Sequence, residues 1–289
     1  MRTANTAILT VIALVAFAAN SVLCRLALGS GLIDAASFTA IRVISGAVVL
    51  GLIILLRRNQ RRAASDWRAG LALFAYMITF SFAYLSLDVG TGALIAFGAV
   101  QLTMFIVAIR GGEQFSLRSW LGLAIAISGL VYLVAPGVTS PDPRGAALMI
   151  VAGVAWGAYS LLGRSAAEPT WATAANFFFS VPLVVLTSLL FIEDFDVSTK
   201  GVLLAVASGA AASGLGYTIW YAALRGHTAT SAATVQLSAP VIAALGGVVL
   251  LAEDLTLRLA ISSIATLGGV AIVLLQRKPA TDQSLSIER

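Results

Sequence analysis

The stretch "GEQFSLRSWLGLAIAISGL" at 112–130 is repeated in altered form as "AEDLTLRLAISSIATLGGV" at 252–270. An alignment of the two pairs Glu113 with Glu253 and Arg118 with Arg258, at an offset of 140 residues. In both copies a short polar opening leads into a long apolar run. Such internal symmetry is typical of membrane proteins built from two copies of one unit.

Two further pairs of segments recur in the same order along the chain. "FAANSVLCR" at 17–25 aligns with "WGAYSLLGR" at 156–164 at an offset of 139, and both end in arginine. The glutamine of "GAVQLTMFIV" at 98–107 aligns with that of "ATVQLSAPVI" at 233–242 at an offset of 135. Because three anchors keep one order, chance similarity is a poor explanation, and we predict two homologous halves.

The composition is that of a protein with many membrane spans. Of 289 residues, 59% are hydrophobic and only 11% are charged, whereas soluble domains carry about 25% charged residues. Apolar runs between polar breaks predict one integral domain over 1–289, with a polar tail at 279–289 and ten spans. The predicted spans are 7–28, 35–56, 69–87, 92–109, 119–135, 146–162, 172–191, 201–224, 229–251 and 258–275.

The repeat and the span count together predict the fold class. Each half, 7–135 and 146–275, holds five spans, and because five is odd the second half must cross the membrane in the opposite sense. We therefore expect an all-α integral membrane protein with ten transmembrane helices, arranged as a five-plus-five inverted repeat around a central cavity. The first span is long and lacks a small-residue cleavage site, so we interpret it as a helix rather than a signal peptide.

The basic residues predict the orientation. With ten spans, 13 of the 18 basic residues fall on the side of the termini, and the other side holds only Arg25, Arg42, Arg144, Lys200 and Arg258. The positive-inside rule places both termini in the cytoplasm. The net charge of +5 is explained by loops that meet anionic membrane lipid, so it indicates no nucleic-acid partner. Cys24 is the single cysteine, which excludes an internal disulfide.

Several segments in combination resemble a known family. They are the two arginine-ended segments above, "SFTAIRVISG" at 37–46 with Arg42, "GYTIWYAAL" at 216–224, "VQLSAP" at 235–240, and the glutamate-to-arginine openings at 113–118 and 253–258. Over nearly the whole chain the sequence resembles the drug/metabolite transporter superfamily, specifically its EamA-type ten-helix exporters, and among these the amino-acid exporters. Two positions depart from the family: Met104 stands where a proline such as Pro240 is expected, and Phe17 stands where tryptophan is common.

The resemblance implies export of small metabolites by alternating access across a bacterial inner membrane. Amino acids, including aromatic or medium-sized ones, and related amphiphiles are the expected substrates. A multidrug carrier, a carrier of another metabolite such as a nucleotide sugar or a cationic drug, and a passive channel stay open as alternatives. A homo-oligomer is also left open.

The candidate substrate-binding residues are polar and aromatic side chains within the spans. A glutamine amide left unpaired in hydrocarbon costs several kcal/mol, so Gln101 and Gln236 are predicted to line the cavity, with interhelical hydrogen bonding as the alternative. Serines and threonines in such spans often only bond their own helix, and deep aromatics often only pack. The full candidate set is Asn20, Tyr76, Thr79, Tyr84, Gln101, Thr103, Trp156, Tyr159, Ser160, Tyr217, Trp220, Gln236 and Ser238, drawn from a buried polar set that also includes Ser21, Asn176 and Tyr221.

The charged residues near the spans have separate interpretations. Arg42 can either extend to the outer face or attract a substrate carboxylate or gate the path. Glu113 and Glu253 each precede a helix start, so they are expected to cap a helix or fix a loop. Every acidic residue falls in or beside a loop, so we expect no carboxylate relay for protons or sodium and favour transport down a gradient.

An intramembrane serine protease is the enzymatic alternative, since the chain has Ser213 before Gly214 and a single histidine, His227. Fourteen residues of helix separate the serine and histidine by about 21 Å, which is too far for proton transfer. The small residues around Ser213 favour a close helix contact instead. With one histidine and one cysteine, no metal cluster is expected. We therefore predict no enzyme activity, no cofactor and no metal.

Overall fold

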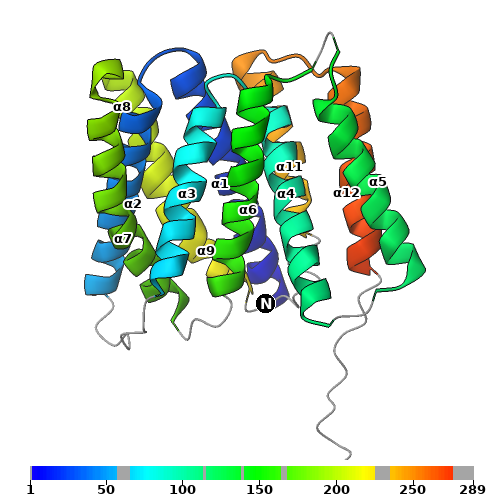
Figure 1. Ribbon diagram of the computed structural model, residues 1–289. Helices are drawn as coiled ribbons and strands as arrows, with labels where there is room; N and C mark the ends of the chain where they lie inside the picture. Colours follow the sequence, from blue (N-terminus) through cyan, green and yellow to red (C-terminus); the bar gives the residue numbers. More distant parts are fainter. Residues whose placement is uncertain are drawn as a thin grey trace, which may run out of the picture.

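A computed structural model describes residues 2–56, 66–112, 115–137, 140–163, 168–224 and 235–275. Within these ranges, eight helices are long and apolar enough to cross a membrane, and two shorter apolar helices, Trp67–Ala83 and Ser238–Leu251, stand beside them. The helices form one bundle, and the first described helix begins at the same end at which the last one ends (Figure 1). The predicted all-α membrane fold with ten spans is confirmed.

The chain order of the elements follows the predicted spans. The first half comprises α1 (Arg2–Gly29), α2 (Ala35–Leu56), α3 (Trp67–Ala83), α4 (Val89–Arg110) and α5 (Leu117–Val134). The second half comprises α6 (Pro143–Gly163), α7 (Pro169–Leu190), the short 3-10 turn η1 (Ile192–Asp194), α8 (Thr199–Val206), η2 (Ala207–Leu215), α9 (Gly216–Leu224), α11 (Ser238–Leu251) and α12 (Leu257–Leu275).

Helices of the two halves are interleaved in the bundle. Each first-half helix makes its most extensive contact with a second-half helix: α1 with α9 and α11, α2 with α7, α3 and α4 with α6, and α5 with α12. Small residues allow this approach. The Cα of Gly153 on α6 lies against the carbonyl of Ala96 on α4, and Gly122 on α5 and Gly269 on α12 lie against each other's backbone. Any space at the centre is therefore bounded by both halves.

Three spans differ from the sequence expectation; in the one predicted over 229–251, the described helix α11 begins only at Ser238, after a turn at Leu237. The span predicted over 69–87 ends at Ala83, because the backbone N–H of Tyr84 bonds back to Phe80 and Ser81 and the chain then turns to begin α4. The span predicted as one α-helix over 201–224 changes to a π-helix, η2, between α8 and α9. The long run of small residues permits this widening, since few side chains fill the turns.

The two glutamine-bearing helices also differ from each other. α4 runs unbroken from Val89 to Arg110 past Gln101 and Met104. In the second half, the chain turns at Leu237 and α11 begins at Ser238, with Pro240 in its first turn, where proline is well tolerated. Met104, which stands where the family has a proline, thus lies within an uninterrupted helix.

Candidate functional site

Arg42 lies in the interior of the bundle, seven residues into α2. Its side chain is fully buried, so it does not extend to the outer face. One terminal nitrogen, Nη2, donates to the Tyr76 hydroxyl at 3.3 Å and to Ser213 Oγ at 3.5 Å. The guanidinium carbon also lies 5.5 Å from the ring centre of Tyr76 and 5.3 Å from that of Phe80. These distances suit cation–π contact.

The π-helix η2 supplies two serines to this region. In a π-helix residues five apart fall on nearly the same face, so Ser208 and Ser213 both point toward the first half. Ser208 Oγ donates to Asn20 Oδ1 at 2.6 Å, and Asn20 Nδ2 donates to the Tyr76 hydroxyl at 3.4 Å. Gly209 packs directly on the backbone carbonyl of Arg42. The network thus joins α1, α2 and α3 of one half to η2 of the other.

Aromatic rings continue the network away from Arg42. The ring of Trp156 on α6 lies 4.8 Å from that of Tyr76, 5.3 Å from Tyr159 and 5.2 Å from Tyr217. Phe17 on α1 joins Tyr217 and Trp220 at 5.9 and 5.8 Å. We call Tyr76, Trp156 and Tyr217 the ring cluster. It brings together α3, α6 and α9, so candidate residues from both halves meet at one place.

Four hydroxyls of the candidate set donate to backbone carbonyls three or four residues earlier in the chain. Thr79, Thr103 and Ser160 each donate to the carbonyl four residues earlier, at 2.7 to 2.8 Å, and Ser238 donates to the carbonyl of Val235 at 2.6 Å. Their protons are therefore already engaged, and only their lone pairs are available to a ligand. This is the local role that serine and threonine commonly take in membrane helices.

Tyr84 and Tyr159 use their hydroxyls in contacts between elements. The Tyr84 hydroxyl donates to the carbonyl of Val89 at 3.4 Å, at the start of α4, and its ring packs against Phe80. The Tyr159 hydroxyl lies 3.5 Å from Thr173 Oγ1 on α7. Both residues border the ring cluster or the Arg42 environment, and both hold helices together there.

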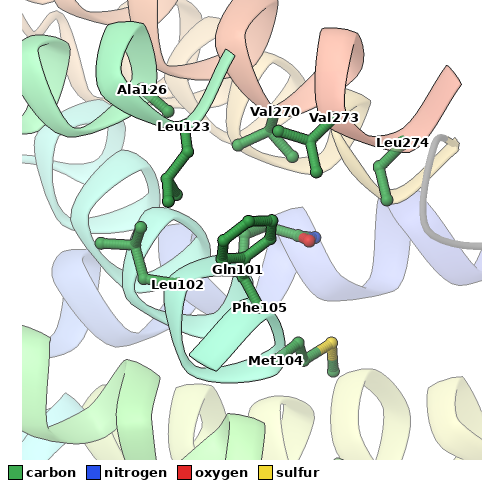
Figure 2. A pocket seen from close by; sticks show the side chains of 9 residues that line it. All are labelled: Gln101, Leu102, Met104, Phe105, Leu123, Ala126, Val270, Val273 and Leu274. Atoms are coloured by element: carbon green, nitrogen blue, oxygen red, sulfur yellow. The ribbon is translucent and has the colours of Figure 1, made fainter. Parts of the chain in front are cut away.

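Gln101 lies at a separate cavity between α4, α5 and α12. The cavity measures about 50 Å³, which is room for a few water molecules. Its other lining side chains are apolar and surround Gln101 (Figure 2): Leu102, Met104, Phe105, Leu123, Ala126, Val270, Val273 and Leu274. None of these residues belongs to the ring cluster.

Gln236 is half-buried near the start of α11. Its neighbour Val235 packs with the Trp220 group, and Leu237 packs against Ala126 and Val270, which line the Gln101 cavity. The chain at Gln236 therefore lies between the two regions. That both glutamines face one shared cavity stays a prediction.

Charged side chains join helices at one end of the bundle, where the links α1–α2, α3–α4 and α11–α12 lie (the upper end in Figure 1). Arg25 at the end of α1 lies 3.2 Å from Asp88, which precedes α4, and 3.5 Å from Glu253, in the link between α11 and α12. Arg25 also donates to the carbonyls of Tyr84 and Leu85. We call Arg25, Asp88 and Glu253 the ionic latch. It ties the first half to the second.

Glu253 caps the start of α4 rather than the helix that follows it in sequence. Its two carboxylate oxygens accept the backbone N–H of Val89 at 3.1 and 2.9 Å. Burial raises the pKa of this carboxyl above its ordinary value, and the charge of Asp88 adds to the rise, whereas the Val89 N–H and Arg25 oppose it. Its repeat partner Glu113 lies outside the described residues.

Backbone contacts reinforce the same end. The loop between α1 and α2 pairs with the segment before α8: Asp34 N–H donates to the Asp196 carbonyl at 2.8 Å, and Ser198 N–H donates to the Leu32 carbonyl at 3.0 Å. Ser86 donates to Asp142, ahead of α6, at 3.0 Å. The latch end is thus held by three separate contacts between the halves.

Sequence reasoning missed part of this site. Ser208 and Ser213 lie in a run of small residues that predicts only a close helix contact. Their spacing of five residues, which places both on one face of a π-helix, is the signal that could have identified them. Ser213 contacts Arg42 instead of a histidine, and His227 lies outside the described residues. The region around Gly209 is the close helix contact that the small residues predicted.

Comparison with known proteins shows what this chain is similar to. The sequence profile of the EamA-like transporter family matches residues 143–275. An uncharacterized protein of Pseudomonas aeruginosa is 46% identical over 274 residues, which are 94% of this chain and 96% of that protein. An uncharacterized transporter of Archaeoglobus fulgidus is 28% identical over 216 residues, 72% of this chain and 75% of its own length.

A second uncharacterized transporter of Archaeoglobus fulgidus is 24% identical over 243 residues, 79% of this chain and 83% of that protein. A solved crystal structure at 23% identity superimposes with a TM-score of 0.64 over 91% of this chain and 98% of its own, which supports the fold alone. These relatives carry no named substrate, so the narrower likeness to amino-acid exporters stays a prediction. The chain belongs to the EamA-like transporter family, in the drug/metabolite transporter superfamily, and is an integral membrane transporter.

Proposed function

We propose that the protein exports small amphiphilic metabolites, with amino acids of medium size or with aromatic side chains as the first candidates. The observation that carries this proposal is the composition of the centre. Polar groups of Arg42, Asn20 and Ser213 lie beside the ring cluster, and they come from both halves of the bundle. A polar region next to an aromatic wall suits a molecule with one polar and one apolar end.

The ionic latch favours a carrier over a passive channel. A channel needs a continuous path, whereas here ion pairs and backbone hydrogen bonds join the two halves across one end. Ion pairs of partly exposed groups are worth about 1 kcal/mol or less each, so they can break and re-form during a transport cycle. Rocking of the halves about the central network is the movement that this arrangement supports.

The charge distribution supports transport down a gradient. Within the described residues, each acidic side chain lies in a link or short turn between membrane helices rather than inside one. A carboxylate relay for protons or sodium therefore has no obvious members there. The basic asymmetry of the sequence supports cytoplasmic termini in a bacterial inner membrane, and the latch end then faces outward.

Counterflow in liposomes tests this function. Purified protein is reconstituted in liposomes loaded with unlabelled L-phenylalanine, and labelled L-phenylalanine is added outside, with protein-free liposomes as the control. We expect saturable uptake with a transient overshoot and no accumulation driven by a pH gradient. Linear, non-saturating flux would indicate a channel, and accumulation above equilibrium under a pH gradient would indicate proton coupling. Ethidium in the same assay represents the cationic drugs, which a site beside Arg42 disfavours.

A further inference from the structure

The guanidinium of Arg42 is only partly bonded. Nη2 has its two partners, but Nε and Nη1 are buried and have no hydrogen-bond partner within the described part of the chain. The two ion pairs found there both involve Arg25. Among the described residues, this fully buried cation contacts a phenol, a serine and two ring faces, and no carboxylate.

This arrangement is costly unless a partner arrives. A buried charge without a counterion is destabilising by several kcal/mol, and arginine cannot escape the cost by releasing its proton. The free N–H groups on Nε and Nη1 point from different edges of the guanidinium, and each can donate a charge-assisted hydrogen bond to a carboxylate oxygen. A site that had evolved only to stabilise the fold is better served by an internal carboxylate, such as those that Arg25 has.

We propose that Arg42 binds the carboxylate of the transported molecule through one of its free N–H donors, and that the ring cluster receives its apolar or aromatic part. This inference rests on the proposed function and names its substrate class: small organic carboxylates with an apolar group. Tyr76 joins the two regions, because its hydroxyl accepts from Arg42 and its ring lies 4.8 Å from Trp156.

The site has a further consequence for selectivity. Asn20 Oδ1 already accepts from Ser208, and the described acidic residues lie outside the membrane helices, so an ammonium group meets no carboxylate here. Its contacts are ring faces and the lone pairs of neutral oxygens, with no opposite charge among the described residues. The carboxylate is therefore the required group, and the amino group of an amino acid is tolerated rather than recognised.

Three probes of one shape test the assignment: 3-phenylpropionate (anion), 3-phenylpropylamine (cation) and L-phenylalanine (zwitterion). Binding to the purified full chain in detergent is measured by quenching of tryptophan fluorescence and by thermal shift. We expect the wild type to bind 3-phenylpropionate and L-phenylalanine at least about tenfold more tightly than the amine. Arg42→Gln should lose that preference, and Arg42→Lys, which keeps the charge but loses the planar guanidinium with its five N–H donors, should fall between.

Arg68→Gln is the matched control, because Arg68 is an exposed arginine at the start of α3, and it should bind all three probes as the wild type does. Unchanged anion affinity in folded Arg42→Gln would overturn the proposal. If that variant does not fold, Arg42→Lys with unchanged affinity, or equal binding of anion and amine by the wild type, would overturn it. Anion binding that depends on Arg42 without L-phenylalanine counterflow would support this site and reject amino-acid export. L-phenylalanine counterflow that is unchanged in the Arg42 variants would support amino-acid export and reject this site.

Discussion

Arg25 and Arg42 lie on consecutive helices of the same half, yet their surroundings are opposite. Arg25 is about one-fifth exposed and contacts two carboxylates, Asp88 and Glu253. Arg42 is fully buried and contacts no carboxylate among the described residues. Desolvation alone predicts the reverse, because the buried charge has the greater need of a counterion.

The difference indicates separate tasks for the two arginines. Arg25 joins the halves at one end through carboxylates of the protein itself. Because these ion pairs are partly exposed, each is worth little and can break and re-form. Arg42 keeps free donors at the centre, where both halves meet, so its missing partner is expected to come from outside.

Supplying Arg42 with an internal partner should have the largest effect. Ser213→Asp places a carboxylate beside Nη2, where Ser213 Oγ now lies at 3.5 Å. The introduced charge pairs with Arg42 and competes with substrate, so we expect L-phenylalanine counterflow to fall by at least about tenfold. The thermal midpoint in detergent should hold or rise, because a buried charge gains a counterion.

Ser213→Asn separates charge from size in that experiment. It adds nearly the same volume without a charge, and it should keep most of the transport. Transport by Ser213→Asp at the wild-type rate, in protein that elutes as a single folded species, would show that transport does not need an uncompensated charge on Arg42.

The backbone around the two arginines offers the second test. A Cβ on Gly209 would collide with the Arg42 carbonyl and Ser45 Oγ, whereas a Cβ on Gly29 would meet only the Arg25 guanidinium, 2.7 Å from Nη1. We expect Gly209→Ala to lower the stability by about 1–3 kcal/mol. Gly29→Ala should cost much less, since a flexible side chain moves aside. Equal thermal midpoints for the two variants would contradict a rigid contact at η2.

Removing the latch should have a smaller effect, and the single cysteine can report it. Cys24 is fully buried beside Arg25, so a membrane-impermeant maleimide should label the wild type slowly. Arg25→Gln removes both ion pairs, and a loss of about 1 kcal/mol corresponds to roughly fivefold faster labelling. Arg144→Gln alters an exposed arginine near the same end and should leave the rate unchanged. Equal rates in all three proteins would mean that the latch does not control opening.

The sequence was enough to predict the fold, because the length of each apolar run and the order of the repeated motifs can be read directly along the chain. It was also enough to select Asn20, Tyr76, Trp156 and Tyr217, which the structure gathers at one place. What it could not predict depends on contacts between segments far apart in the chain. Three features are of this kind: the π-helix that directs Ser208 and Ser213 inward, the pairing of the carboxylates with Arg25 and not with Arg42, and the separate cavity at Gln101.

The smallest expected effect is the pH dependence of the stabilisation that comes from Glu253, one of the two carboxylates that pair with Arg25. The pKa of Glu253 is raised above its ordinary value chiefly by burial. A raised pKa in the folded state means that the stabilisation from this group is complete below the ordinary glutamate pKa and is lost as pH rises through the raised value. Wild type should therefore lose thermal stability relative to Glu253→Gln as pH rises from about 4 towards neutrality.

Asp142 provides a control of opposite sign at the same end. Its pKa is lowered, first by the N–H of Gly145 and then by the Ser86 hydroxyl. The stabilisation from Asp142 is therefore present above the ordinary aspartate pKa and is lost as pH falls through the lowered value. The difference between wild type and Asp142→Asn should stay constant from about pH 5 upward and shrink only in stronger acid. The difference in thermal midpoint between wild type and Glu253→Gln could instead be equally flat above about pH 5. That result would mean that burial does not outweigh the contacts of Glu253 with Val89 and Arg25, and that the pKa of Glu253 is not raised.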